Sequence, residues 1–76
     1  MNARKLKVGD VLVMRVNRYV PETRKNRAVV RQILDHGMAR VSIEYLDPVT
    51  RKPLGHWFRF SYEGIERMFS EVQSNG

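Results

Sequence analysis

Arginine is the residue type in this chain that is best suited to bind an anionic partner. Ten of the 14 basic residues are arginines, and the formal net charge is +6. A planar guanidinium donates paired hydrogen bonds to a phosphate and stacks on a nucleobase. Residues 1–34 hold nine basic and two acidic residues, a charge of +7, whereas residues 35–76 carry −1. This distribution indicates nucleic acid as the partner.

The candidate phosphate-binding residues surround the polar segment 21–26, in which Pro21 ends the preceding apolar run. They are Arg15, Arg18, Arg24, Lys25, Arg27 and Arg31. If the segments on either side of this loop pair as strands, the six side chains gather into one basic patch. Strand alternation places Arg15 and Arg18 in opposite phases, so the alternative is a solvated loop with ordinary exposed strand ends.

Two aromatic residues are candidates for stacking on unpaired bases. Tyr19 and Trp57 lie in the polar phase of their predicted strands, Tyr19 in phase with Arg15 and Trp57 with Arg59. An aromatic ring beside arginine on an exposed sheet face binds a base with about 1–3 kcal/mol. The alternative for Trp57, the single tryptophan, is a structural role under a loop or against the helix.

Catalytic and metal-binding constellations are missing from the sequence. There is no cysteine, which excludes thiolate ligands and a thiol nucleophile. His36 lies in a predicted turn and His56 is in phase with Phe58, so neither has a second ligand at suitable spacing. The aspartates Asp10 and Asp35 also fall in turns, where they are favoured locally. We therefore expect a protein that is not an enzyme and that has no metal or other cofactor.

The length of 76 residues predicts one domain, residues 1–76, with a thin core. No apolar run approaches the ~20 residues of a membrane span. The basic residues at the N-terminus are not followed by the apolar region of a signal peptide. Without cysteine, disulfides are excluded. These features predict a cytoplasmic protein without membrane contact.

Hydrophobic periodicity predicts four strands followed by one helix. The strands are expected at about 11–20, 27–35, 38–47 and 56–60, and the helix at about 62–73. Within the helix, Ile65, Met68, Phe69 and Val72 share one face, and Ser61 is the expected N-cap. The turn Asp35-His36-Gly37 predicts a hairpin between the second and third strands.

The predicted strands divide their residues between two faces. In the second strand, Ala28, Val30 and Leu34 are expected on one face, and Arg27, Val29, Arg31 and Ile33 on the other. Such strands must curl to enclose a core. The predicted fold class is mainly β, a small curled antiparallel sheet or SH3-like barrel of four to five strands with one C-terminal α-helix.

The opening segments resemble an SH3-like small barrel. These segments are Val8-Gly9-Asp10-Val11-Leu12-Val13, a long charged loop, and Arg27-Ala28-Val29-Val30. KOW, Tudor and related nucleic-acid-associated modules begin similarly, and the resemblance covers residues 6–60. The chain departs from KOW domains in having no glycine in the first long loop, and it lacks the aromatic cage of methyl-lysine-reading Tudor domains.

The same opening is similar to the toxin endoribonucleases of bacterial toxin–antitoxin modules. That family also has Gly-Asp before its first strand and a second strand that begins with arginine. Its Arg-Pro pair is Arg27-Ala28 in this chain, which is also shorter than the family requires. This resemblance implies ribonuclease activity as a further alternative.

The leading hypothesis is a small nucleic-acid-binding protein, an accessory or regulatory factor of a bacterium, phage or plasmid, that binds DNA or RNA. The main alternative is an adaptor or inhibitor that docks an acidic protein partner. Either function is compatible with a homodimer formed through an extended apolar stripe of the helix.

Overall fold

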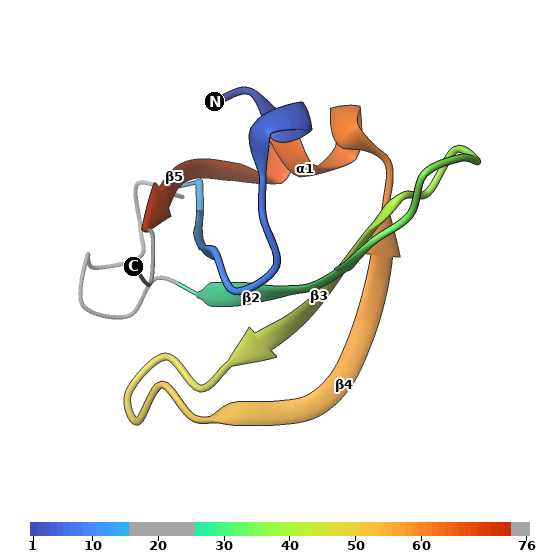
Figure 1. Cartoon of the computed structure of the whole chain (residues 1–76). Coiled ribbons are helices and arrows are strands. Elements are labelled where there is room, and N and C mark those ends of the chain that lie inside the picture. Colours follow the sequence, from blue (N-terminus) through green and yellow to red (C-terminus); the bar gives the residue numbers. More distant parts are fainter. Residues whose placement is uncertain (16–25, 74–76) are drawn as a thin grey trace.

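The computed structural model describes residues 1–15 and 26–73, and these are mainly β, as the sequence predicts (Figure 1). Residues 16–25 and 74–76 fall outside this description. In chain order the described elements are η1 (Ala3–Lys5), β1 (Val11–Met14), β2 (Arg27–Ile33), β3 (Val41–Leu46), β4 (Pro53–Phe60), α1 (Tyr62–Met68) and β5 (Phe69–Gln73). Within these ranges no helix has the length and apolar character needed to cross a membrane.

The five described strands form one antiparallel sheet with the order β4-β3-β2-β1-β5. Strands β4 and β5 are its two edges and do not pair with each other. The sheet is strongly curved, most visibly along β4 (Figure 1). Of the two predicted architectures, the described residues therefore adopt the open curled sheet and not the closed barrel.

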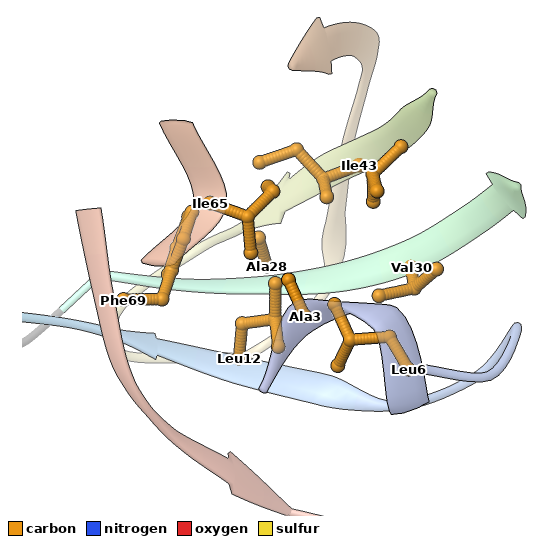
Figure 2. Close-up of a cluster of buried hydrophobic side chains, with 9 residues drawn as sticks. Ala3, Leu6, Leu12, Ala28, Val30, Ile43, Ile65 and Phe69 are labelled. Carbon is orange, nitrogen blue, oxygen red and sulfur yellow. The ribbon is translucent and has the colours of Figure 1, made fainter. Parts of the chain in front are cut away.

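The main hydrophobic cluster lies on one face of this sheet, which we call the inner face. Side chains from the sheet, η1, α1 and β5 converge there (Figure 2). The buried cluster consists of Ala3, Leu6, Leu12, Ala28, Val30, Val41, Ile43, Ile65 and Phe69. Every member is apolar, so this face is stabilised by hydrophobic burial and close packing.

Helix α1 begins as predicted and ends earlier than predicted. The Ser61 hydroxyl accepts a hydrogen bond from the Gly64 backbone amide at 3.0 Å, which confirms the N-cap. The prediction of a helix through residue 73 is wrong, because Phe69 adopts an extended conformation (φ −123°, ψ 142°). From there the chain pairs with β1 as β5. Backbone pairing with a neighbouring strand outweighs the helical periodicity, and Phe69 still reaches the core.

A β-bulge at Arg31 changes which residues of β2 face the core. Val30 pairs with Ile43, but Gln32 pairs with Ser42, so Arg31 is an extra residue on β2. Ile33 consequently packs against the inner cluster. The prediction that Ile33 shares a face with Arg27 and Arg31 is therefore wrong, because regular alternation does not include the bulge.

Most strand boundaries differ from the predicted ones. Strand β1 ends at Met14, and residues 16–20 of the predicted first strand lie outside the described residues. The β2–β3 hairpin is confirmed, although its connection is longer than predicted and spans residues 34–40. Gly37 within it has φ 98°, a conformation that glycine adopts without strain. Strand β4 begins at Pro53 rather than His56, because Pro53 pairs with Leu46.

Candidate nucleic-acid interface

Four of the predicted binding residues meet on the face of β2, β3 and β4 that lies opposite the core. The strand register aligns Val29 with Glu44, Glu44 with Trp57, and Ser42 with Arg59. We call this surface the outer face, and it carries Arg27, Val29, Arg31, Ser42, Glu44, Leu46, Pro53, Trp57 and Arg59. The three buried polar side chains of the described residues, Arg27, Ser42 and Glu44, all lie on it.

Glu44 is the centre of a hydrogen-bond network on the outer face. Its Oε1 accepts from Arg31 Nε at 2.7 Å, and its Oε2 accepts from the Gly55 amide at 2.7 Å. Burial raises the pKa of the Glu44 carboxyl, but hydrogen bonds from Arg31, Gly55 and the Trp57 indole, together with the charge of Arg31, lower it by more. The net pKa lies below its ordinary value, so Glu44 is ionised at neutral pH.

Trp57 lies at the surface and not in the core. Its exposed fraction is 57%, and Arg59, two residues along β4, is also exposed. Trp57 therefore does not have the structural role under a loop or against the helix that the sequence left open. It lies near Glu44 and helps to lower the pKa of that carboxyl, and more than half of Trp57 is exposed and available to a ligand.

Arg27 is buried on the outer face. Its exposed fraction is 8%, and its Nε and Nη1 atoms are buried with no hydrogen-bond acceptor among the described residues. Arg31, the next arginine on the same strand and face, has its Nε engaged by Glu44. The two residues therefore differ: Arg31 is half of an ion pair, whereas Nε and Nη1 of Arg27 have no hydrogen-bond acceptor among the described residues.

Arg27 lines a hollow of about 400 Å³ on the outer face. We call it the outer hollow; its walls include Arg27, Arg31 and Arg51 and the apolar residues Val29, Leu46 and Pro53. Three arginines thus line one recess, and none of its described lining residues is acidic. A recess of this composition attracts anions.

Arg51 is a member of this site that the sequence analysis missed. Its position is fixed by the turn between β3 and β4, in which Asp47 Oδ1 accepts from the amides of Val49 and Thr50, each at 2.8 Å. The Arg51 amide donates to the Asp47 carbonyl at 2.8 Å, and Arg51 has φ 62°. Because β3 runs antiparallel to β2, this turn lies beside Arg27 at the start of β2. The predicted pairing of these two strands could therefore have identified Arg51 from the sequence.

Arg15 contacts the end of α1 and does not join the basic patch that the sequence predicts. Its Nε and Nη2 donate to the Glu66 carbonyl at 3.2 and 2.8 Å. It therefore satisfies a free carbonyl in the last turn of α1 and places positive charge at the negative end of the helix. Arg15 does not line the outer hollow. The remaining predicted residues, Arg18, Tyr19, Arg24 and Lys25, lie outside the described residues.

Two further arginines have structural contacts away from the outer face. The guanidinium of Arg4 lies 4.9 Å from the centre of the Tyr62 ring, and that of Arg40 lies 5.7 Å from it. Both distances are in the range of cation–π contacts. The Tyr62 ring at the start of α1 is therefore covered by charge and is not part of an open apolar stripe.

A second hollow, of about 410 Å³, opens on the opposite side of β4. We call it the inner hollow; Met14, Tyr45, Leu54, His56 and Phe58 line it. The Tyr45 and Phe58 rings meet edge to face at 5.5 Å, and burial raises the pKa of Tyr45. Leu54 and Phe58 are 55% and 48% exposed, so β4 presents apolar side chains at an open sheet edge.

Residues 1–15 and 26–73 contain no group of three or more histidine or acidic side chains placed to hold a metal ion. The arrangement on the outer face offers charge and stacking surface to an anionic ligand. Comparison of the chain with protein-family models, with curated proteins and with solved structures found no match.

Proposed function

We propose that this protein binds nucleic acid through its outer face and the adjoining Arg51. The observation that supports the proposal is the grouping of three arginines and a half-exposed tryptophan on one face of a sheet, with a fourth arginine in the adjoining turn. Arg27, Arg31, Arg51 and Arg59 supply positive charge for phosphates, and Trp57 supplies a flat surface for a base.

The proposed ligand is single-stranded, because stacking on Trp57 requires an unpaired base. Glu44 has two effects in this arrangement. It fixes the Trp57 indole and the Arg31 guanidinium, and its negative charge repels phosphates from the centre of the face. Phosphates are therefore expected to lie on the two sides of Glu44, near Arg59 and near the outer hollow, with a base over Trp57.

The proposal is of binding without catalysis. A cytoplasmic site of action accords with nucleic acid as the ligand and with a chain that contains no cysteine and so needs no oxidising compartment. The ribonuclease alternative is tested by the same preparation, since incubation with labelled RNA reveals any new ends.

The test is binding of nuclease-treated protein to labelled single-stranded DNA, RNA and duplex DNA over a series of salt concentrations. We expect the single strands to bind more tightly and to quench Trp57 fluorescence. The logarithm of the binding constant should fall linearly with the logarithm of the salt concentration. Arg51→Gln and Arg59→Gln should each lower this slope by about 0.7, the value for one phosphate contact on a single strand.

Arg67→Gln is the matched control, because Arg67 is an exposed arginine in the last turn of α1, away from the outer face. Its slope should equal that of the wild type. If the salt dependence of Arg51→Gln and Arg59→Gln also equalled that of the wild type, the outer face would not be the binding surface. Preference for duplex over single strands would contradict the stacking role of Trp57.

A second candidate function is docking of an acidic protein segment along β4. The exposed edge of β4, with Leu54 and Phe58 beside the inner hollow, supports it, because an extended peptide adds to such an edge by backbone pairing. The net charge of +6 favours an acidic segment. Phe58→Ser should abolish binding of the acidic segment and leave nucleic-acid affinity unchanged. Arg59→Gln should weaken nucleic-acid binding more strongly than it weakens binding of the acidic segment.

A further inference from the structure

The buried Arg27 guanidinium requires an explanation. A charged group that is removed from water is stable only when a counter-charge and hydrogen-bond acceptors replace its hydration. The Nε and Nη1 atoms of Arg27 are buried and have no acceptor within the described residues. Buried groups of this kind are rare in folded proteins, and an external ligand is one of the accepted reasons for them.

Glu44 does not provide the missing counter-charge. Both of its carboxylate oxygens are occupied, Oε1 by Arg31 and Oε2 by the Gly55 amide. Asp47 is nearby in sequence to Arg51, but its Oδ1 is committed to the backbone amides of Val49 and Thr50. The acidic groups of β3 and of the following turn are thus engaged in holding the structure.

Arg27 lines the outer hollow together with two more arginines, Arg31 and Arg51. The hollow also has apolar parts in its wall, from Leu46 and Pro53. Positive charge from several arginines at one recess attracts an anion. Phosphate suits this environment, because its several oxygens accept charge-assisted hydrogen bonds from more than one arginine at once.

We infer that the outer hollow is a phosphate-binding site in which Arg27 is the buried contact and Arg51 the exposed one. This inference rests on the proposed function, in which the phosphate belongs to a nucleic acid, either at a strand end or within the strand. The inference goes beyond the proposed function in one respect: one phosphate binds in a defined recess, whereas the other proposed contacts with nucleic acid lie on an open surface.

The first test uses inorganic phosphate and the wild-type protein without nucleic acid. Thermal unfolding is followed over a phosphate titration, with sodium chloride at matched ionic strength as the reference. We expect a saturable rise in Tm of at least about 4 °C over the chloride reference. A Tm that is the same in phosphate and in chloride would overturn the inference.

Arg27→Met and Arg51→Gln identify the site, and Arg67→Met is the control. Arg27→Met should abolish the phosphate effect, and in chloride it should unfold about 4–8 °C above the wild type, because it removes a buried charged group with two nitrogens that have no acceptor among the described residues. Arg51→Gln should weaken phosphate binding at least tenfold without that gain in Tm. Phosphate stabilisation that persists in both variants would overturn the inference, as would its loss in Arg67→Met.

Oligonucleotides with and without a 5′ phosphate separate this inference from the proposed function. If the 5′ phosphate increases affinity for the wild type and not for Arg27→Met, the site takes a strand end. If both oligonucleotides lose affinity equally in Arg27→Met, it takes a phosphate within the strand. If phosphate binds at Arg27 but no oligonucleotide binds, the inference stands and the proposed function fails. If oligonucleotides bind the wild type and Arg27→Met equally and phosphate has no effect, the proposed function stands and the inference fails.

Discussion

The inner and outer faces of the sheet bury different kinds of residue. The inner face holds a cluster of nine buried apolar residues that α1, η1 and β5 cover (Figure 2). The outer face also buries the apolar residues Val13, Val29 and Leu46. Unlike the inner face, it buries polar side chains as well, those of Arg27, Ser42 and Glu44, and it exposes Trp57. The first arrangement lowers the free energy of the folded chain by itself, whereas the second contains a buried guanidinium with two nitrogens that have no acceptor among the described residues. The contrast teaches that the inner face is built from apolar packing alone, whereas the outer face combines apolar packing with buried polar groups, and it is there that we propose a ligand binds.

The largest expected effect is on the inner face. Phe69 is fully buried, so Phe69→Ala should reduce the free energy of unfolding by about 3–5 kcal/mol, measured by urea denaturation. That is a large part of the stability of a small domain. Val49→Ala, at a position that is 77% exposed, is the control and should change the stability by less than about 0.5 kcal/mol. Equal effects of the two variants would mean that the inner cluster is not the core.

The next effect is on binding to the outer face. Trp57→Ala should weaken binding of a single-stranded oligonucleotide by about 1–3 kcal/mol, which titration by fluorescence anisotropy measures. Trp57→Phe keeps an aromatic surface and should retain most of the affinity. Leu54→Ala changes another exposed residue of β4, beside the inner hollow, and should have no effect. If Leu54→Ala weakened binding as much as Trp57→Ala, the ligand would lie on the other side of β4.

A smaller effect is expected from variants that distinguish an arginine with a structural contact from one proposed to bind nucleic acid. Arg15→Met removes two hydrogen bonds to the Glu66 carbonyl and should destabilise the fold by about 1 kcal/mol, with unchanged affinity for nucleic acid. Arg59→Gln should show the reverse pattern, with lower affinity and unchanged urea midpoint. A loss of affinity in Arg15→Met would extend the interface to the end of α1.

The smallest effect is a dependence of stability on pH. The pKa of Asp47 is lowered from 3.8, first by the hydrogen bond from the Thr50 amide and then by that from Val49, and the pKa of Glu44 is lowered from 4.5. A carboxyl whose pKa is lower in the folded state stabilises the fold above its unfolded pKa, and this contribution is lost as pH falls through the folded value. The urea midpoint should therefore decline below pH 4.5 and change little between pH 5 and 7.

Asp47→Ala is the variant that checks this pH dependence. It removes the carboxylate that accepts from the turn amides, so its urea midpoint should be lower at pH 7 and should decline less steeply under acid. A decline as steep as that of the wild type would assign the acid sensitivity to other carboxyl groups. The same variant should weaken oligonucleotide binding, because the turn holds Arg51 beside the outer hollow.

The sequence predicted the fold class and the N-terminus of α1, because these depend on local patterns. Alternation in β3 and the cap at Ser61 are visible in a few consecutive residues. It did not predict that residues 69–73 form β5, because that strand exists through pairing with β1 across the sheet. The bulge at Arg31 was missed for the same reason, since two residues of β2 share one partner on β3.

Part of the candidate site was predictable, and part was not. Arg27, Arg31, Trp57 and Arg59 were identified by residue type and strand phase, and the register of β2, β3 and β4 brings them together. Arg51 was missed because it belongs to a turn distant in sequence. The burial of Arg27 was not visible either, because an arginine at a strand end gives no sign of its exposure.

The most direct test of the central claim is mapping of amide and indole NMR shifts during titration with a single-stranded oligonucleotide. We predict the largest changes at the Trp57 indole, at the Gly55 amide and around Arg59 on the outer face. The core residues Leu12 and Ile65 should change little. Shifts concentrated on α1 or on the residues of the inner hollow would contradict the account, because they would place the ligand on the opposite side of the sheet.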